Sequence, residues 1–225
     1  MLVRQESFPQ VSTTKVWTSN EPSFTVPGAI EPSGATTELN VYNTNGVLSG
    51  FLTKNGQSML RISGEAYGVI DVQPFKDDTT TLNNWSRQGF GISCTFKSDR
   101  HPFSNRTVFF IGDYNTDEQF SEGIKIGLED ITWSYTDGNI KETMSCKIQQ
   151  DVINTVDFIV NKNPGKMVVA IFINGILSTA REIKNDFTWR TSSKIYLGCD
   201  ISNAGQIQNF ADVNFYDIKL FRVPA

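Results

Sequence analysis

The chain has 225 residues, of which 39% are hydrophobic and 20% are charged; this is the composition of a folded globular protein and allows one large all-β domain. Its 24 acidic and 20 basic residues are mixed along the chain and give a net charge of -4, so the clustered Lys and Arg that bind nucleic acid are absent. No apolar run approaches the ~18 residues of a membrane span, and the first residues lack the apolar stretch of a signal peptide.

The N-terminal part, residues 1–57, contains Pro9, Pro22, Pro27 and Pro32 among Ser, Thr and Gly. This composition predicts an extended arm or lead-in strands. Residues 58–225 show short strand-like segments with turn signals between them, and they predict one β-sandwich domain.

The middle of the chain shows the alternation of strands that bury one face. In residues 89–96 the side chains of Phe90, Ile92, Cys94 and Phe96 alternate with Gly, Ser and Thr. Further along, Ile131, Trp133 and Tyr135 share one face of a strand, and Asp137-Gly138 follows as a tight turn. We therefore expect Trp133 and Tyr135 in the core.

Two successive hairpins are predicted in residues 156–182. The Asn163-Pro164-Gly165 turn joins the first two strands, and Asn174-Gly175 joins the second to the third, because Asn and Gly tolerate the positive φ of a type I′ turn. Residues 193–198 and 210–223 predict the last two strands, and the imperfect alternation of the second one predicts a bulge. Roughly a dozen strands without a crossover helix predict two antiparallel sheets packed face to face.

The cysteines are Cys94, Cys146 and Cys199, each within a strand-like segment. Their number is odd, no Cys-x-x-Cys pair occurs, and His101 is the single histidine, so neither a disulfide framework nor a structural zinc site is expected. We expect three buried free thiols in a protein that folds in a reducing cytoplasm.

The order of three C-terminal segments matches a known pattern. "FIVNKNPGKMVVAIFINGIL", "KIYLGCD" and "FADVNFYDIKLFR" follow one another as a hairpin with an Asn-Gly turn, a short strand and a closing strand. This order resembles the laminin-G-like and concanavalin A-like lectin family. "LRISGEAYGVIDVQPF" followed by "GFGISCTFKSDR" is also similar to lectin-like domains in tail or baseplate proteins of phages that infect Gram-positive bacteria. The resemblance, over about Met59 to Val223, implies a jelly-roll sandwich that attaches to glycan or to neighbouring proteins.

Hydrolytic members of this family place carboxylates at alternate positions of one strand, where they face the same way and flank a glycosidic bond. Glu129 and Asp130 are adjacent and would point to opposite faces, and Asp212 and Asp217 differ by an odd number. We find no same-face pair and expect no enzymatic activity. His101, which precedes proline in a polar loop, is expected to be solvated or to stabilise a turn.

Residues 112–123 suggest a cation site. Asp113, Asn115, Asp117 and Glu118 offer the hard oxygen ligands that calcium prefers. The segment is not an EF-hand, because Gly at the sixth position and Glu at the twelfth are both missing. A calcium site formed by the first three residues and a solvated acidic loop are the two alternatives, and no other cofactor is expected.

Aromatic side chains in loops are the candidates for saccharide binding, because their faces stack on a pyranose ring while neighbouring amides and charges bind its hydroxyls. The predicted ligand-binding residues are Trp85, Tyr114, Asn185, Asp186, Trp189 and Arg190. The alternative for each loop Trp is to anchor its loop to the core.

Three functions remain open. The first is a non-enzymatic, lectin-like domain of a phage or phage-like tail protein that binds a cell-surface polysaccharide of a Gram-positive host. Such a protein would fold in the host cytoplasm and act in the virion or outside the cell after lysis. The second is a structural module that spaces or oligomerises tail proteins, as a homo-oligomer or with other virion proteins. The third is a hydrolase of wall glycan.

Overall fold

The computed structural model describes several separate stretches of the chain. They are residues 10–15, 38–43, 50–54, 57–71, 90–103, 105–117, 119–137, 140–163, 166–183 and 194–222. These stretches form β-strands joined by turns and short loops. None of the described stretches contains a helix with the length and apolar character that crossing a bilayer requires.

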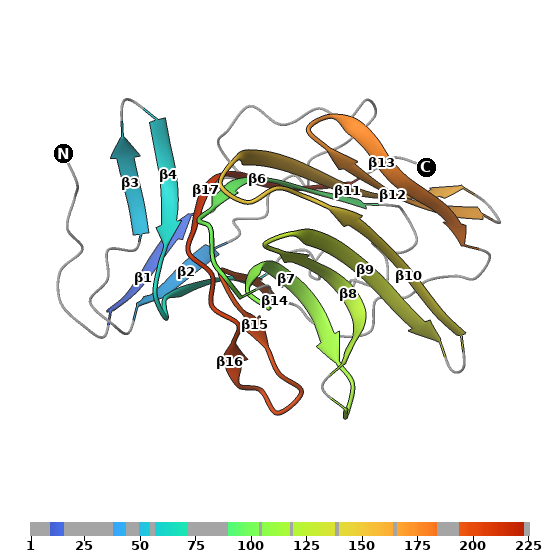
Figure 1. Cartoon of the computed structure of the whole chain (residues 1–225), viewed down its shortest axis with the longest axis horizontal. Coiled ribbons are helices and arrows are strands. Elements are labelled where there is room, and N and C mark those ends of the chain that lie inside the picture. The colour runs from blue at the N-terminus through green and yellow to red at the C-terminus, as the bar shows by residue number, and fades with distance from the viewer. Residues whose placement is uncertain are drawn as a thin grey trace.

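In the described stretches, seventeen strands build two large antiparallel sheets and one small hairpin. Figure 1 shows their arrangement. In the order of hydrogen-bonded neighbours, sheet A contains β1 (Gln10–Lys15), β2 (Glu38–Asn43), β5 (Tyr67–Asp71), β14 (Lys194–Leu197), β7 (Thr107–Tyr114), β8 (Phe120–Gly127), β9 (Asp130–Asp137) and β10 (Ile140–Lys147). Sheet B contains β13 (Ile176–Ile183), β12 (Lys166–Ile173), β11 (Ile153–Asn163), β6 (Phe90–Ser98), β17 (Val213–Arg222), β4 (Gln57–Ile62) and β3 (Gly50–Lys54). The hairpin consists of β15 (Asp200–Ile201) and β16 (Ile207–Gln208).

The two sheets pack face to face as a jelly-roll sandwich, and the predicted fold class is confirmed. Figure 1 shows β11, β12 and β13 as one layer and β7, β8, β9 and β10 as the other. Between them, sheet B contributes Phe96, Phe158 and Phe215, and sheet A contributes Phe109 and Trp133, each at most 1% exposed. Every second side chain of a strand enters this layer because successive residues point to opposite faces. The prediction that Trp133 belongs to the core is confirmed.

The Asn174-Gly175 turn joins β12 and β13 as predicted. The φ angles of 53° and 77° are the left-handed values that a type I′ turn requires. Strand β12 also pairs with β11, so these three strands form the predicted meander. The Asn174 N–H donates to the Thr155 carbonyl at 2.7 Å, and Asn174 Oδ1 accepts the Thr155 N–H at 2.8 Å. The turn therefore lies beside the start of β11.

The last strand contains the bulge that its imperfect alternation predicts. The register of β17 against β6 shifts between Phe215 and Asp217. Because one residue is added there, Phe215 and Ile218 both reach the core although they are three positions apart.

All three cysteines carry free thiols, as predicted. Cys94 and Cys199 are buried, and burial raises the pKa of both thiols, which keeps them protonated. The expectation of burial is wrong for Cys146, which is only partly buried because its strand, β10, forms an edge of sheet A.

The N-terminal part of the chain contributes strands to both sheets. Strand β1 pairs with β2, and β2 pairs with β5 in sheet A, whereas β3 pairs with β4 in sheet B. These strands and the small hairpin bring the number of strands above the expected dozen. The division of the chain into an arm and a domain at residue 57 stays a prediction.

A second apolar cluster lies on the outer face of sheet A. Its buried members include Val69, Phe110 and Tyr196, which point away from the main core. Ile201 and Ile207 of the β15–β16 hairpin pack against them. The hairpin therefore covers one part of this outer face, over β7 and β14.

Candidate functional site

Five of the six predicted saccharide-binding residues lie outside the described residues. They are Trp85, Asn185, Asp186, Trp189 and Arg190. Their role in ligand binding stays a prediction. The sixth, Tyr114, is the last residue of β7 and is partly buried.

Tyr114 belongs to a polar network centred on Asp200, whose side chain is completely buried. The Tyr114 hydroxyl donates to Asp200 Oδ2 at 2.7 Å and accepts a hydrogen bond from Lys125 Nζ at 2.8 Å. Lys125 also pairs with Asp200 at 2.9 Å, and Thr107 Oγ1 and Asn209 Nδ2 donate to the same carboxylate. Tyr114 therefore helps to hold the β15–β16 hairpin on sheet A.

The predicted calcium ligands lie in different surroundings. Asn115 Oδ1 accepts the backbone N–H groups of Asp117 at 3.0 Å and Gln119 at 2.8 Å, so its oxygen stabilises the β7–β8 turn. Asp117 is exposed, and Glu118 lies outside the described residues. Within the described ranges, no three His, Cys, Asp or Glu side chains are grouped to hold a metal ion. The calcium site stays a prediction.

Asp113, the third predicted ligand, faces Glu122 across β7 and β8. Both carboxylates lie on the core side of sheet A, because they continue the alternation of Ile111 and Ile124. Burial raises the pKa of Asp113 to about 6, and the negative charge of Glu122 contributes as the second cause. Asp113 Oδ2 is buried without a hydrogen-bond partner among the residues described.

A groove of about 960 Å³ opens at one end of the sandwich. Three connections between strands line it. The β6–β7 connection contributes Arg100, His101 and Pro102, and the β8–β9 connection contributes Glu129. The β10–β11 connection contributes residues 148–152, beside Lys147 at the end of β10. We name this hollow the rim groove. Its size lies within the range of small-molecule sites, roughly 300 to 1,000 Å³.

Gln150 connects the three loops that form the rim groove. Its Oε1 accepts the His101 N–H at 2.9 Å, and its Nε2 donates to Glu129 Oε1 at 2.8 Å. The Asp151 N–H donates to the Ser98 carbonyl at 3.0 Å and so joins the β10–β11 loop to the end of β6. Because these bonds join the loops to one another through protein groups, they stabilise the shape of the groove.

His101 stabilises the β6–β7 connection, which agrees with the turn-stabilising role expected from the sequence. Its Nδ1 lies 3.2 Å from the Phe103 N and its Nε2 lies 3.2 Å from Arg106 Nη2. Since a neutral imidazole has one acceptor nitrogen, His101 accepts from one of these donors at a time. Its ring also packs against Phe103, with 5.3 Å between the centroids.

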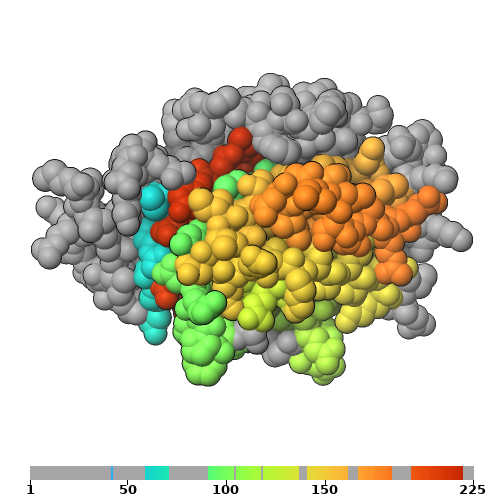
Figure 2. Space-filling model, turned by 45° about the horizontal axis from the view of Figure 1, so that its top comes forward, coloured from blue at the N-terminus to red at the C-terminus, as the bar shows by residue number. Residues whose placement is uncertain are grey.

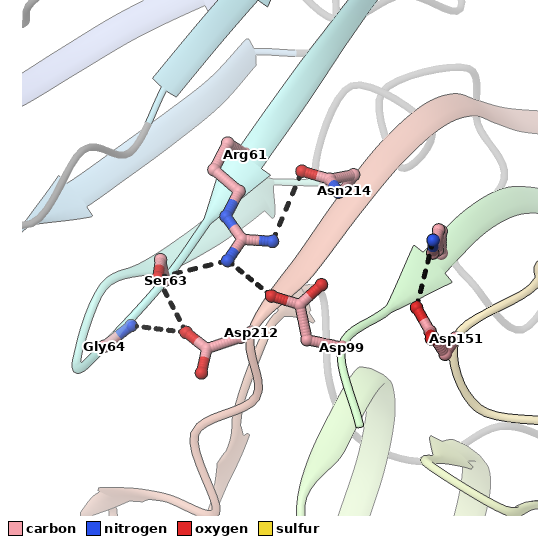
Figure 3. A network of polar contacts seen from close by, with 8 residues as sticks. Arg61, Ser63, Gly64, Asp99, Asp151, Asp212 and Asn214 are labelled. Carbon is pink, nitrogen blue, oxygen red and sulfur yellow. Dashed lines mark hydrogen bonds and ion pairs between the residues drawn. The ribbon is translucent and has the colours of Figure 1, made fainter. Parts of the chain in front are cut away.

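A network of polar contacts anchors the base of the same connection (Figure 3). Arg61 of β4 donates to Asp99 Oδ2 at 2.7 Å and to Asn214 Oδ1 of β17 at 3.4 Å. Ser63 donates to Asp212 Oδ1 at 2.7 Å, and the Asp99 N–H donates to the Asp212 carbonyl at 2.9 Å. Segments distant in sequence thus fix the position at which the β6–β7 connection leaves the sheet.

The charges around the rim groove compensate one another. Two ion pairs lie at its edge, Lys97–Asp151 at 3.0 Å and Lys147–Asp130 at 3.9 Å. Arg100 and Glu129 make no ion pair with a described residue, and their charges are opposite. The groove therefore offers amide, guanidinium and carboxylate groups without a strong net charge, which suits an uncharged polar ligand.

The large hydrophobic side chains that the structure describes as exposed surround this end of the molecule. They are Phe103 (62% exposed), Val152 (40%), Ile153 (52%), Ile176 (73%) and Leu177 (53%). Figure 2 shows the three segments that carry them next to one another: the β6–β7 connection (green), the β10–β11 region (yellow) and β13 (orange). A polar groove with an exposed apolar rim is typical of a binding surface.

Strand pairing brings together carboxylates that spacing along one strand does not reveal. Asp157 of β11 and Asp217 of β17 lie on the outer face of sheet B, on either side of β6. Ser93 donates to Asp157 at 2.6 Å, and Lys219 pairs with Asp217 at 2.6 Å. Burial raises the pKa of Asp157, against the hydrogen bond from Ser93 and the charge of Lys219. The inference from the sequence concerned carboxylates at alternate positions of one strand, so it does not cover this pair, and neither residue lines the rim groove.

The sequence prediction does not include Arg100, Phe103, Gln149 or Gln150. The sequence does indicate two loops, around residues 99–106 and 148–152. Each follows a strand whose apolar and polar residues alternate strongly. Nothing in the sequence shows that these loops meet. Pairing of β6 with β11 brings them to the same end of the sandwich.

The sequence matches no protein-family model and no curated protein. Solved structures with a similar fold include the binding domain of botulinum neurotoxin serotype D, at 16% identity and a TM-score of 0.53, which covers 85% of this chain and 45% of that one. Another is the binding domain of botulinum neurotoxin DC in complex with rat synaptotagmin II, at 14% identity and a TM-score of 0.52, over 86% and 47% of the two chains.

A third similar structure comes from a study of botulinum neurotoxin type C whose cell entry depends on interaction with two ganglioside molecules. Its identity is 15%, its TM-score is 0.51, and the match covers 86% of this chain and 46% of that one. The chain spans just under half the length of these three proteins. At this level of identity, the comparison shows the shared sandwich fold.

Proposed function

We propose that this chain is a non-enzymatic, lectin-like binding module whose rim groove takes a saccharide. In this proposal it belongs to a phage or phage-like tail or baseplate protein and attaches the particle to a polysaccharide of the host cell surface. The observation that carries the proposal is the rim groove itself, an open hollow of about 960 Å³ whose walls combine polar and apolar groups and whose border is apolar and exposed.

The chemistry of the groove supports a saccharide ligand. Gln149 and Arg100 present amide and guanidinium groups that can bind sugar hydroxyls. Phe103, 62% exposed beside the groove, offers a flat face that can stack on the C–H face of a pyranose. The near-neutral charge of the groove favours hydroxyl groups over a polyanion.

The comparisons and the sequence provide further support. The structural neighbours are binding domains, and one of them comes from a toxin whose entry depends on ganglioside molecules. The phage context is supported by the resemblance of the segments in the sequence and by three free thiols, which suit assembly in a reducing cytoplasm.

The test is binding to purified wall polysaccharides of Gram-positive bacteria and to a glycan array. We expect Phe103→Ala to weaken binding about five- to tenfold, the value of one aromatic contact. Thr116→Ala is the control, because it removes an exposed side chain at the β7–β8 turn, at the end of β7 opposite the rim groove. Trp189→Ala tests the predicted loop in parallel. Absence of binding by the unaltered protein, with and without calcium, would refute the proposal.

A structural module is the second candidate, and the exposed apolar side chains favour it. Ile176 and Leu177 are 73% and 53% exposed on β13, at an edge of sheet B. In a tail assembly they would be buried against a neighbouring protein or a second copy. An oligomer in light scattering that dissociates in the double variant Ile176→Ser, Leu177→Ser, without any saccharide binding, would favour this candidate. Turnover of wall glycan that Asp157→Asn abolishes would instead favour a hydrolase.

A further inference from the structure

The outer face of sheet A is divided into two parts of different character. Over β14 and β7 it is apolar, and the β15–β16 hairpin covers it. Over β9 and β10, the outward positions carry hydroxyl groups, as at Thr132, Ser134 and Thr143. The hairpin therefore ends where the hydroxyl-bearing part begins.

A hollow of about 370 Å³ lies on this second part, and we name it the trough. Thr132, Ser134 and Thr143 are among its lining residues, together with Phe120, Lys125 and Lys141. The Ser134 hydroxyl is buried and shares a hydrogen bond of 3.3 Å with the Thr143 hydroxyl, so the exposed Thr143 and the partly exposed Thr132 present the row of hydroxyl groups at the surface. The trough is separate from the rim groove, because the two hollows have no lining residue in common.

The ammonium group of Lys125 is held in place at the wall of the trough. It pairs with the buried Asp200 at 2.9 Å and donates to the Tyr114 hydroxyl at 2.8 Å, and it lies 5.4 Å from the centroid of the Tyr114 ring. An ammonium group has three N–H donors, and these contacts use two of them. With respect to the described residues, one donor remains for a ligand, on a side chain whose conformation is already fixed.

Lys141 supplies a second cation on the same surface. It is exposed, lines the trough and makes no ion pair with any described residue. The carboxylate among the lining residues, Asp130, lies 3.9 Å from Lys147. The charge of Asp200 offsets that of Lys125, so Lys141 remains as the uncompensated charge. Among the residues that the structure describes, the trough therefore combines one unpaired cation, Lys141, with a row of hydroxyl groups.

We propose that the trough is a second ligand site, for a saccharide that carries a carboxylate group. Its hydroxyl row and the free donor of Lys125 would bind sugar hydroxyls, Lys141 would bind the carboxylate, and Phe120 would contact an apolar edge of the ring. The rim groove, whose charges compensate one another, takes the uncharged saccharide of the proposed function. The two surfaces thus differ in the charge of the ligand that they accept.

The first test is an NMR titration of the full chain with oligogalacturonate and, as a matched probe, with its neutral methyl ester. We expect the carboxylated probe to shift the backbone amide signals of Thr132, Lys141 and Thr143 at millimolar concentrations, and the ester to leave them unchanged. Added salt should weaken the effect, because the contact is exposed and ionic. Shifts confined to Arg100 and Gln150 in the rim groove, equal shifts with both probes, or no shifts at all would overturn the proposal.

The second test uses the lysines. Lys141→Gln should weaken binding of oligogalacturonate about tenfold, or about 1.4 kcal/mol. Lys194→Gln is the matched control, since it removes an exposed lysine at the start of β14, outside both hollows. Unchanged affinity in Lys141→Gln would overturn the trough proposal and leave the proposed function intact, because wall-polysaccharide binding and its loss in Phe103→Ala are measured separately.

Discussion

Replacement of Asp113 by Asn should make the protein more stable at neutral pH and change the pH dependence of its stability. The Asp113 carboxyl lies opposite Glu122 on the core side of sheet A, and one of its oxygens has no hydrogen-bond partner among the described residues. Burial and the neighbouring charge both disfavour the ionised form. Asn has nearly the same shape and carries no charge, so the substitution removes this penalty.

The magnitude follows from the pKa of Asp113. A rise from the ordinary value of 3.8 to about 6 corresponds to roughly 3 kcal/mol at 1.36 kcal/mol per pKa unit. Asp113 is only partly buried, so solvent screening lowers the expected effect to about 1 kcal/mol. Below pH 3.8 the Asp113 carboxyl is protonated in both the folded and the unfolded chain, so the stability that the protonated form gives to the folded chain is fully present. As the pH rises through about 6, the contribution is lost, because ionisation is easier in the unfolded chain.

The assay is urea unfolding followed by tryptophan fluorescence, at about pH 4 and about pH 7.5. At the higher pH, Asp113→Asn should exceed the unaltered protein in unfolding free energy by about 1 kcal/mol, and at the lower pH the difference should shrink. Asp117→Asn, on the exposed turn that follows β7, controls for the loss of one charge. An equal difference at both pH values, or a less stable Asn variant at neutral pH, would show that Asp113 does not lie in the surroundings described.

Three further predictions concern the framework of the two surfaces. Asp200→Ala should lower the unfolding free energy by about 3 kcal/mol in urea titrations, because it leaves Lys125 without its buried partner; a loss below about 1 kcal/mol would contradict the network. Gly123→Ala should lower the melting temperature, because Gly123 has φ of 115° and an added Cβ would collide with the backbone of β7. An unchanged melting temperature would argue against the close approach of β7 and β8 at this position. Arg61→Ala should lower the unfolding free energy by only about 1 kcal/mol, since the ion pair of Arg61 with Asp99 is partly exposed, but it should speed hydrogen exchange of the backbone amides in residues 99–103. Unchanged exchange would mean that the network does not anchor the loop.

Local chemistry was sufficient to predict most of the strands from residue 58 onward. The alternation of Phe90, Ile92, Cys94 and Phe96 identifies a strand with one buried face because the period of a strand is two residues. The Asn174-Gly175 pair identifies a hairpin because few other residues adopt two consecutive positive φ angles. The irregular last strand revealed its bulge for a similar reason. Such patterns are properties of a few neighbouring residues, and they remain visible in the sequence.

The hollows are properties of the tertiary structure. Gln150 reaches Glu129 and His101 because strand pairing brings three loops to one end of the sandwich, and no spacing along the chain encodes that meeting. The same reason explains why the sequence hides the pair of Asp157 and Asp217, which lie on different strands. From residue 58 onward, the sequence alone determined most of the strands and the side of each that is buried, since that depends on neighbours in the chain. Which polar groups share a surface was decided only by the order and register of the strands, since those depend on residues far apart.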